Sequence, residues 1–531
     1  MPTRGAPDDP PAPFFRAEKA AGGADGVRTA GTPTVALGHR VGASDGIHAG
    51  WTWDGARLRV ENDRYGMQPL FYWRHAGGIC VSPAIARLLE EGAPAALDGE
   101  ALAVFFRVGF FLGEDTPFAH IRALPPGAVL EWRAEGSKGA ETAHGGGSFT
   151  LSSRRALPSR TLDLPRTALR DGYIDLFRQA IRRRPPPAAD FVVPLSGGRD
   201  SRHILLELHA QGHRPAYCIT ARGLPPKGDE DARIAALLAR ALGVDHVVVG
   251  PPVSPLREER RKNRITSFCS DEHAWLMGVR DRLQPGVAAL YDGIGGDTLS
   301  TAGLFVTPAL LDIFRKGPPE RIAHEFIARF GSASEAALAR MLAPGLARAA
   351  SREAAVRRLA DELEKHLHAP NPINSFIFWN RTRREIALAP FAVLAPARTV
   401  FAPYLDHDLY DFLAALSVDV VLRGNLHDEA IRRAYPVHAA LPYESAGAGA
   451  AAARQVPRGI DRALRAQIAG SLPARLMNNA FLLSRLGVGL LAPARIRWMA
   501  PLLTYLGQLE TLGAFATPER KENSNERTLS V

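Results

Sequence analysis

Short apolar runs broken by turn residues fill the N-terminal part of the chain, from Thr34 to about Trp132. At Arg57-Leu58-Arg59-Val60 polar and apolar residues alternate with a period of two, the pattern of a strand with one solvated face. Helical spacing interrupts the strands at Pro83–Glu91 and from Asp98 to about Val108. We therefore expect an antiparallel, sheet-rich N-terminal domain.

Beyond Leu164 the apolar runs alternate with segments of helical periodicity. The predicted elements are helix Leu169–Arg183, strand Phe191–Leu195, a helix from Asp200 that stops at Gly212, strand Ala216–Thr220, helix Asp231–Leu242, strand Val244–Val249, helix Glu272–Leu283 and strand Val287–Tyr291. Such alternation specifies an α/β domain whose parallel sheet is covered on both faces and binds ligands at the carboxyl ends of its strands. From Ala302 onward helical patterns dominate.

Three segments lack a clear period and are predicted to lie outside the two domains. The first is rich in proline, glycine and charge, the second in glycine and serine, and the third is polar. The predicted organisation is a disordered N-terminus (1–30), a sheet-rich domain (31–135), a linker (136–163), an α/β domain with a helical extension (164–515) and a polar tail (516–531).

The composition is that of a globular protein of two or three domains, with 531 residues, 46% hydrophobic and 23% charged. The net charge of +10 comes mostly from dispersed arginine, with clusters at Arg182–Arg184 and Arg257–Arg264. Such clusters are usually solvated faces, and the alternative is a site for a polyanion or a peptide. Neither zinc-ligand spacing nor an aromatic-rich sheet motif accompanies them, so we expect no nucleic-acid partner.

The three cysteines, Cys80, Cys218 and Cys269, are far apart and odd in number. They form neither a disulfide framework nor a metal knuckle, which favours a reducing, cytoplasmic location. The N-terminus has no apolar run that would make a signal peptide. The apolar stretch 480–506 is interrupted by three arginines, so we expect no transmembrane segment.

The stretch FVVPLSGGRDSR, Phe191–Arg202, has the order that a nucleotide phosphate site needs. A buried strand leads into a turn whose two glycines let backbone N–H groups approach an anion, and the following helix points its positive end at the same place. Asp200 would then hold Mg²⁺ rather than phosphate. The alternative is a surface turn that happens to contain two glycines.

A second glycine loop, DGIGGD at Asp292–Asp297, follows the predicted strand that ends at Tyr291. In a parallel sheet it would reach the same edge as the first loop, so that Asp200 and Asp297 share one Mg²⁺ through carboxylate oxygens. Two unrelated loops are the alternative. The pair of loops favours a nucleotide site far more than either loop alone.

The chain resembles the asparagine synthetase family in five stretches that follow the family's order. SGGRDS and DGIGGD are similar to its SGGxDS pyrophosphate loop and its SGEGxDE loop. NDRYGMQPLFYW (62–73) and IRALPPGAVLEW (121–132) resemble segments of its glutaminase domain, and FAPYLDHDLYDFLAALSVDVVLRG (401–424) resembles its PFLDxxLxxFxxxLP segment. The likeness covers most of residues 50–445.

The resemblance implies a degenerate glutaminase-like domain followed by an ATP-pyrophosphatase-type domain, similar to the adenine nucleotide alpha hydrolases, with ATP and Mg²⁺ as cofactors. ATP would activate a carboxylate as an acyl-adenylate, and an amine would then displace AMP. The metal ligands carried over are Asp200 and Asp297. The nucleotide-binding residues carried over are Pro194, Leu195, Ser196, Gly197, Gly198, Arg199, Asp200, Ser201, Ile219, Asp292 and Gly293.

Departures from the family pattern bear on the source of the amine. Pro2 stands where glutamine-using members carry a nucleophilic cysteine, so we expect no glutamine hydrolysis. Ile294 replaces the glutamate of the second loop, and Thr298 replaces a following acid. The family's acyl-transfer lysine has no evident equivalent, and Arg454 is the substitute that we consider. The amine is therefore expected to come from a substrate rather than from ammonia.

Among the branches of the family without glutaminase activity, the lasso peptide cyclases fit best. The β-lactam and carbapenam synthetases use a tyrosine at the position of Ile294, which the chain lacks. A cyclase would join an Asp or Glu side chain of a precursor peptide to that peptide's own N-terminal amine, in antibiotic biosynthesis, with a leader-cleaving cysteine protease and a leader-binding protein as expected partners. The alternatives are a small-molecule amide ligase and a nucleotide-binding scaffold without turnover.

Several other residues each allow two interpretations. Glu385, in the charged helical pattern NRTRREI, is a candidate general base facing the cleft, but one half of an arginine pair is the favoured interpretation. His273 is expected to be structural. Phe376, Phe378 and Trp379 are expected in the core rather than in a peptide pocket. Arg199 and Arg202, which flank the aspartate and serine of the first loop, have no assigned role.

Overall fold

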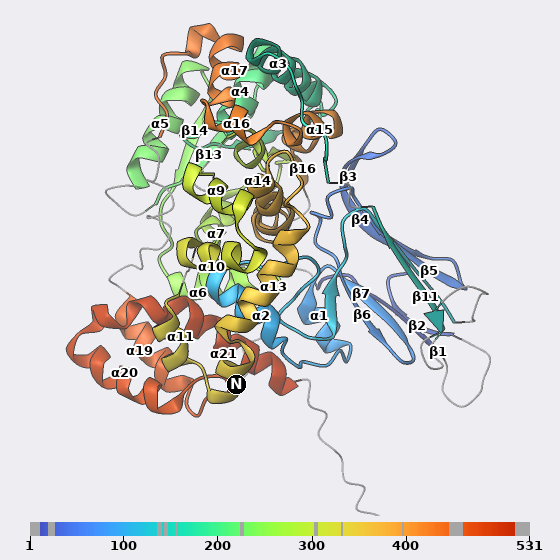
Figure 1. Ribbon diagram of the computed structural model, residues 1–531, viewed down its shortest axis with the longest axis vertical. Coiled ribbons are helices and arrows are strands. Elements are labelled where there is room, and N and C mark those ends of the chain that lie inside the picture. The colour runs from blue at the N-terminus through green and yellow to red at the C-terminus, as the bar shows by residue number, and fades with distance from the viewer. Residues whose placement is uncertain are drawn as a thin grey trace, which may run out of the picture.

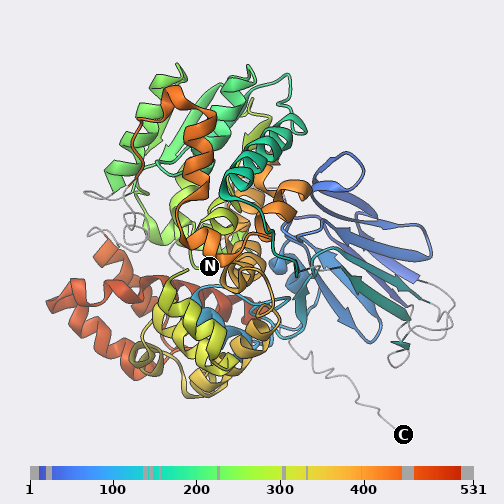
Figure 2. The ribbon, with the colours of Figure 1, turned by 45° about the horizontal axis from the view of Figure 1, so that its top comes forward.

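The computed structural model describes residues 11–19, 27–134, 141–142, 147–154, 157–223, 228–301, 306–330, 333–395, 398–444 and 460–515. Figure 1 shows three regions. A pair of antiparallel sheets lies on the right, a parallel sheet with its helices at the top, and a helical layer that includes the last helices at the lower left. Figure 2 gives the same arrangement from a view turned by 45°.

Two antiparallel sheets form the N-terminal domain. The first has the order β2 (Val27–Gly31), β1 (Phe15–Lys19), β7 (Gly78–Ser82), β6 (Phe71–His75) and β8 (Ile121–Ala123). The second has the order β10 (Glu141–Thr142), β11 (Ser148–Ser153), β9 (Ala128–Arg133), β5 (Arg57–Asn62), β4 (Asp45–Trp53) and β3 (Thr34–Val41).

The alternation that predicted a sheet with one solvated face is confirmed in β5. There Leu58 and Val60 are fully buried, whereas Arg57 and Arg59 are partly exposed. The apolar faces of both sheets meet in one core, which includes Trp51 from β4 and residues of β1, β7 and β9.

Two expectations for the flanking segments are wrong. Phe15–Lys19 and Val27–Gly31, expected to be disordered, are strands, because Phe15 and Ala17 point into the core and β1 pairs with both β2 and β7. In the expected linker, Ser148–Ser153 pairs with β9, although four of its six residues are exposed. These strands depend on backbone pairing with distant partners rather than on apolar content. The expected tail, 516–531, lies outside the described residues.

The third sheet belongs to the α/β domain, and all five of its strands are parallel. Their order is β14 (His246–Val249), β13 (Tyr217–Ala221), β12 (Phe191–Pro194), β15 (Ala289–Tyr291) and β16 (Thr399–Phe401). The first four match the predicted strands, and the three-residue β16 was not predicted. The chain moves outward from β12 in one direction and then returns to its other side, so the strand order reverses between β12 and β15. Open sheets of this kind bind ligands at that reversal, outside the carboxyl ends of the strands.

Three of the predicted helices are present with similar bounds: α3 (Arg166–Arg182), α4 (Asp200–Ala210) and α5 (Gly228–Ala241). The other helices of this domain are α6 (Pro255–Ile265), α7 (Met277–Arg282), α8 (Gly296–Ser300), α15 (His407–Ala414), α16 (Val418–Leu422) and α17 (Leu426–Ala434). The helix expected over Glu272–Leu283 begins later than predicted, because His273 has a positive φ of 78° that no regular helix accommodates.

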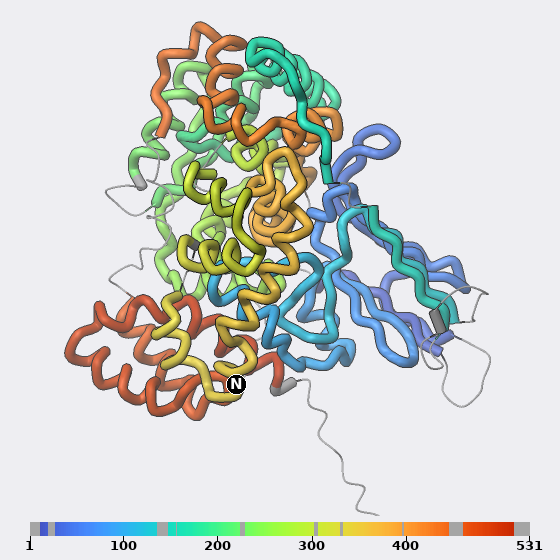
Figure 3. Tube along the Cα trace, in the orientation of Figure 1, coloured from blue at the N-terminus to red at the C-terminus, as the bar shows by residue number. Residues whose placement is uncertain are grey.

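The helical layer joins the two ends of the chain. The helices that contribute to the apolar core of this layer, in part from outside the lower left of Figure 1, are α1 (Ile85–Glu90), α2 (Gly99–Val108), α9 (Pro308–Lys316), α10 (Pro319–Phe330), α11 (Glu335–Met341), α12 (Pro344–Ala349), α13 (Arg352–Glu364), α14 (Pro372–Ile377), α19 (Asp461–Gly470), α20 (Asn479–Leu491) and α21 (Ala500–Phe515). Phe105 of α2 stacks on Tyr505 of α21 with ring centroids 4.9 Å apart, and Figure 3 shows the two segments side by side. Among the described helices, none is both long and apolar enough to cross a membrane.

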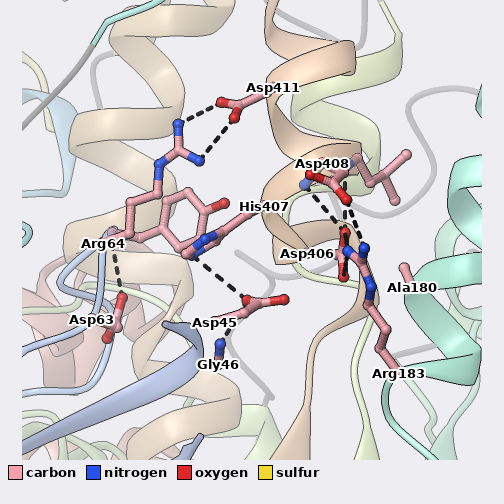
Figure 4. Close-up of polar contacts among 12 residues, drawn as sticks. Asp45, Gly46, Asp63, Arg64, Ala180, Arg183, Asp406, His407, Asp408 and Asp411 are labelled. Carbon is pink, nitrogen blue, oxygen red and sulfur yellow. Dashed lines mark hydrogen bonds and ion pairs between the residues drawn. The ribbon is translucent and has the colours of Figure 1, made fainter. Parts of the chain in front are cut away.

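Ion pairs connect the N-terminal domain to the α/β domain (Figure 4). Arg184, which was expected on a solvated face, is buried and contacts Asp45 of β4 at 2.6 Å and Asp406 at 2.8 Å. Arg183 contacts Asp406 at 3.1 Å. Burial alone would raise the pKa of Asp406, but Arg184 and Arg183 more than offset it and hold that pKa below its ordinary value.

We predict that Arg184→Ala destabilises the protein by about 3–5 kcal/mol, because Asp45 loses its arginine partner and Asp406 keeps Arg183 alone. Urea denaturation at neutral pH measures the change. The exposed arginine of the Arg357–Glu100 pair is the control, and Arg357→Ala should cost less than about 1 kcal/mol.

The pKa of Asp406 is lowered in the folded protein. Its ionised carboxylate therefore stabilises the folded state above the pKa of an unfolded aspartate, and this stabilisation is lost as the pH falls through the folded pKa. The difference in free energy of unfolding between the wild type and Arg184→Ala should therefore become smaller below about pH 4. A difference that stays constant into the acid range would contradict this account of the interface.

Candidate active site

The first glycine loop joins β12 to α4, where the sequence placed it. Pro194 pairs in register with Ile219 of β13, and the N–H of Leu195 donates to the carbonyl of Ile219 at 2.8 Å. The N–H of Ser196 donates to Oγ of Ser201 at 3.0 Å, which closes the turn. The loop therefore lies at the carboxyl edge of the sheet with the N-terminus of α4 behind it, as an anion site requires.

The second loop lies directly against the first. A Cβ added at Gly293 would lie 2.6 Å from Cβ of Asp200, and one added at Gly296 would lie 2.6 Å from its Cγ. The carboxylate of Asp292 accepts from the N–H of Ile294 at 2.8 Å, and burial raises the pKa of Asp292 to about 6. The prediction that the two loops converge is confirmed, and their contact requires glycine at both positions.

Asp200 and Asp297 come together at this contact. The N–H of Asp297 donates to Oδ2 of Asp200 at 2.8 Å, and Oδ1 of Asp200 has no hydrogen-bond partner among the described residues. Burial raises the pKa of Asp200 well above its ordinary value, and the carboxylate of Asp297 adds to the rise. A buried carboxylate oxygen without a partner, beside a second carboxylate, fits a divalent cation with oxygen ligands such as Mg²⁺.

A buried polar network supports Asp200 from behind, and the sequence did not reveal it. His427 lies with Nε2 3.2 Å from Nδ1 of His203 and 3.1 Å from the hydroxyl of Tyr404. Its Nδ1 is 3.1 Å from Oγ of Ser300 and 3.5 Å from Oδ1 of Asp200. Burial lowers the pKa of His427 to about 3, so this ring is neutral and its contact with Asp200 is not an ion pair.

The segment from Leu441 to Glu444 crosses the first loop. Arg202 donates to the carbonyl of Leu441 at 3.0 Å, and its guanidinium carbon lies 3.9 Å from the ring centroid of Tyr443. Arg199 lies over the same ring at 4.6 Å. The structure thus gives Arg202 a role that the sequence did not: it holds the segment that leads toward Arg454, which itself lies outside the described residues.

A carboxylate already contacts one backbone amide of the first loop. The N–H of Gly197 donates to Oδ1 of Asp231 at 2.6 Å, and the carbonyl of Gly197 accepts from the N–H of Glu444 at 3.1 Å. Burial, with Asp231 beside it, raises the pKa of Glu444 to about 7. A phosphate oxygen that binds the Gly197 amide therefore has to replace Asp231.

Glu385 is buried, not exposed to a cleft as expected. It lies in a π-helical segment, Phe378–Ile386, and its Oε2 is 3.4 Å from Nε of Arg381, which confirms the predicted arginine pair. The neighbouring Arg383 is also buried and donates to the carbonyls of Gly113 and Leu124 in the N-terminal part. The charged pattern is therefore an interface with that part rather than a solvated helix face.

The remaining candidates behave as structural residues. His273 is buried, and burial lowers its pKa to about 4. The aromatic residues expected in the core are all 1% exposed or less: Phe376, Phe378 and Trp379. Ile294 is buried beneath the second loop, and Oγ of Thr298 lies 3.2 Å from Oγ of Thr382.

None of the three cysteines is placed to act as a nucleophile. All are fully buried. Burial raises the pKa of Cys80 and of Cys218 to about 12 and that of Cys269 to about 11. Each thiol is therefore protonated at neutral pH, whereas nucleophilic attack requires a thiolate.

The contact between the two loops predicts the effect of one methyl group. Gly293→Ala should lower the free energy of unfolding by about 1–3 kcal/mol, because its Cβ meets Asp200 and the backbone N of Ser201. The matched control is Gly286→Ala, whose Cβ meets no atom within 4 Å, and which should change stability by less than about 0.5 kcal/mol. Equal stability of the two variants in thermal or urea denaturation would refute the close contact.

Comparisons with known proteins agree with this geometry. A family model described as glutamine amidotransferase domain matches residues 36–142, and one described as asparagine synthase matches residues 172–446. No curated protein matches the chain. The second match covers more than half of the sequence and includes both glycine loops. The chain belongs to the asparagine synthase family of ATP-dependent carbon–nitrogen ligases.

Proposed function

We propose that this ligase is a macrolactam synthetase of the lasso peptide type. It adenylates an Asp or Glu side chain of a precursor peptide with release of pyrophosphate. The peptide's own N-terminal amine then attacks the activated carbonyl carbon, the amide forms, AMP leaves, and the amine gives up one proton. The observation that carries the activation step is the meeting of two glycine loops around the unpartnered Oδ1 of Asp200.

The chain's own groups have defined roles in this proposal. Backbone N–H groups of Gly197–Ser201 and the N-terminus of α4 hold the leaving phosphates, whose negative charge grows as they depart. The adenosine lies against the backbones of Pro194, Ile219 and Gly293. Asp200 and Asp297 would hold Mg²⁺, which would screen the phosphate charge when bound. Asp200 stays fixed because Gly293, Gly296 and the histidine network enclose it.

We infer that the substrate carries the amine, because none of the three cysteines offers a usable thiol. Cys80, the cysteine within the matched glutamine amidotransferase region, is buried and protonated and therefore offers no thiolate nucleophile. Ile294 puts an aliphatic side chain where ammonia-using relatives have an acid. An amine carried by the substrate satisfies both observations. A basic, helix-rich C-terminal region suits a long peptide, and the proposed partners are the leader-cleaving protease and leader-binding protein.

A macrolactam synthetase has a product that can be recognised by its mass. Protein incubated with ATP, Mg²⁺ and a precursor core peptide should yield AMP, pyrophosphate and a peptide whose mass is lower by one water. Mass spectrometry measures the product, and a peptide with its acceptor Asp or Glu changed to Asn or Gln is the control. AMP formation with a small amino acid but with no peptide would show a small-molecule ligase instead.

The proposed metal ligand Asp200 can be tested by substitution. Asp200→Ala should lower pyrophosphate release at least ~10²-fold, because the site loses its buried carboxylate and the cation that this carboxylate holds. Asp312→Ala, at an exposed acid of α9, should leave the rate unchanged. Chelation with EDTA should abolish release in the wild type and added Mg²⁺ should restore it. Unchanged release in Asp200→Ala would refute the metal assignment.

A further inference from the structure

Helix α20 has an outer face without any charged residue. Leu483 is 58% exposed, Leu490 73% and Leu491 91%. Their spacing along the helix places them on one side, in a row that we call the leucine row. The exposed positions of the helix are all uncharged: Ala480, Leu483, Ser484, Gly487, Leu490 and Leu491.

The opposite face of α20 is apolar as well. Leu482 and Gly489 are buried there, and a Cβ added at Gly489 would lie 2.7 Å from Cδ1 of Ile496. Phe481 and Leu486 are partly buried against the core of the helical layer. The helix is thus apolar on its inner and on its outer side.

Helix α13 shows what a helix of this layer looks like when its outer face lies in water. It has thirteen residues, as α20 has. Its exposed positions are all charged: Glu353, Arg357, Asp361 and Glu364. A helix that is apolar all round is typical of a buried position or of contact with lipid, so we expect an apolar partner over the leucine row.

The region around α20 has an excess of positive charge. Residues 460–515 include six arginines and two acids. Both acids are engaged, because Asp461 pairs with Arg497 at 2.6 Å and Glu510 accepts from the backbone N–H of Arg475 at 2.6 Å. Four arginines make no ion pair with any residue that the structure describes: Arg462, Arg475, Arg485 and Arg495. The partner of this region should therefore carry negative charge.

Two side chains bring polar groups to the border of the leucine row. Nε of Arg485 donates to Oγ of Ser484, which belongs to the outer face, at 3.2 Å. After the helix, Trp498 is 45% exposed, and its Nε1 donates to the carbonyl of Arg495 at 3.1 Å. Exposed leucines with arginine and tryptophan beside them are the composition of helices that lie in the headgroup region of a bilayer.

We propose that α20 binds the surface of an anionic lipid bilayer. The leucine row enters the boundary of the acyl chains, and the four unpaired arginines face the headgroups. An anionic bilayer supplies an apolar layer and negative charge together, which matches both features of this region. With thirteen residues α20 is about 20 Å long, whereas the hydrocarbon core is ~30 Å thick, so the contact is peripheral.

The docking surface lies away from the candidate active site. Figure 1 shows α20 at the lower left edge of the molecule and α4, which follows the first glycine loop, at the top. A bilayer at α20 would therefore leave the nucleotide site open to solution. The inference does not depend on the peptide substrate of the proposed function.

Co-sedimentation of the full chain with lipid vesicles tests the leucine row. The wild type should bind vesicles of phosphatidylcholine and phosphatidylglycerol at least ~10-fold more tightly than vesicles of phosphatidylcholine alone, and high salt should weaken that binding. Leu490→Ser combined with Leu491→Ser should lower the affinity at least ~10-fold. The matched control is Val253→Ser with Val437→Ser, at positions 103% and 88% exposed outside α20, and it should bind like the wild type.

The arginines are tested in the same assay. Arg485→Gln combined with Arg495→Gln should lower the affinity for anionic vesicles at least ~5-fold. Two exposed arginines of α9 and α13 provide the control, and Arg315→Gln with Arg357→Gln should leave the affinity unchanged. Equal binding by the leucine variant and the wild type, or equal affinity for anionic and neutral vesicles, would overturn the proposal. A wild type that ignores vesicles but forms a dimer in sedimentation velocity, lost in the leucine variant, would overturn it in favour of a second copy of the chain.

Discussion

The close approach of Gly293 and Gly296 to Asp200 is the contact on which the site depends. Neither position has room for a Cβ, and each brings backbone of the second loop against the first residue of α4. That approach partly buries Asp200, whose pKa is raised by burial, and Oδ1 of Asp200 has no hydrogen-bond partner in the described part of the chain. The same contact requires β12 and β15 to be neighbours, which is the point where the strand order reverses. The order of the strands and the glycines of the second loop therefore together determine the candidate cation site.

The rest of the chain keeps that contact in place. Helices α4 and α17 and the turn around Tyr404 bring the two histidines beneath Asp200, and Arg202 fixes the segment that crosses the first loop. The N-terminal domain contributes Asp45, which pairs with Arg184, and the carbonyl of Gly113, which accepts from Arg383 of the π-helical segment. The N-terminal domain, whose Cys80 is buried, therefore has a structural role: it packs against the α/β domain through these contacts.

The sequence predicted the elements whose signal is local. Four parallel strands follow from apolar runs, and both loops follow from glycines placed directly after those runs. It did not predict β1, β11 or β16, because short or polar strands form through pairing with distant residues. It also placed Glu385 and Arg184 at the surface, because charge in a helical pattern gives no sign of a buried partner. Asp231, Glu444, His203 and His427 were missed for the same reason: each acts through a contact that only the fold creates.

The central proposal is that Asp200 and Asp297 would hold one cation beside the phosphates of bound ATP. The most direct test is a crystal structure with Mn²⁺ and a non-hydrolysable ATP analogue, in which anomalous scattering locates the metal. The account predicts a peak within coordination distance of both carboxylates, with the phosphates on the backbone amides of Gly197–Ser201 and Asp231 displaced from Gly197. A nucleotide bound elsewhere, or a metal that contacts neither carboxylate, would contradict it.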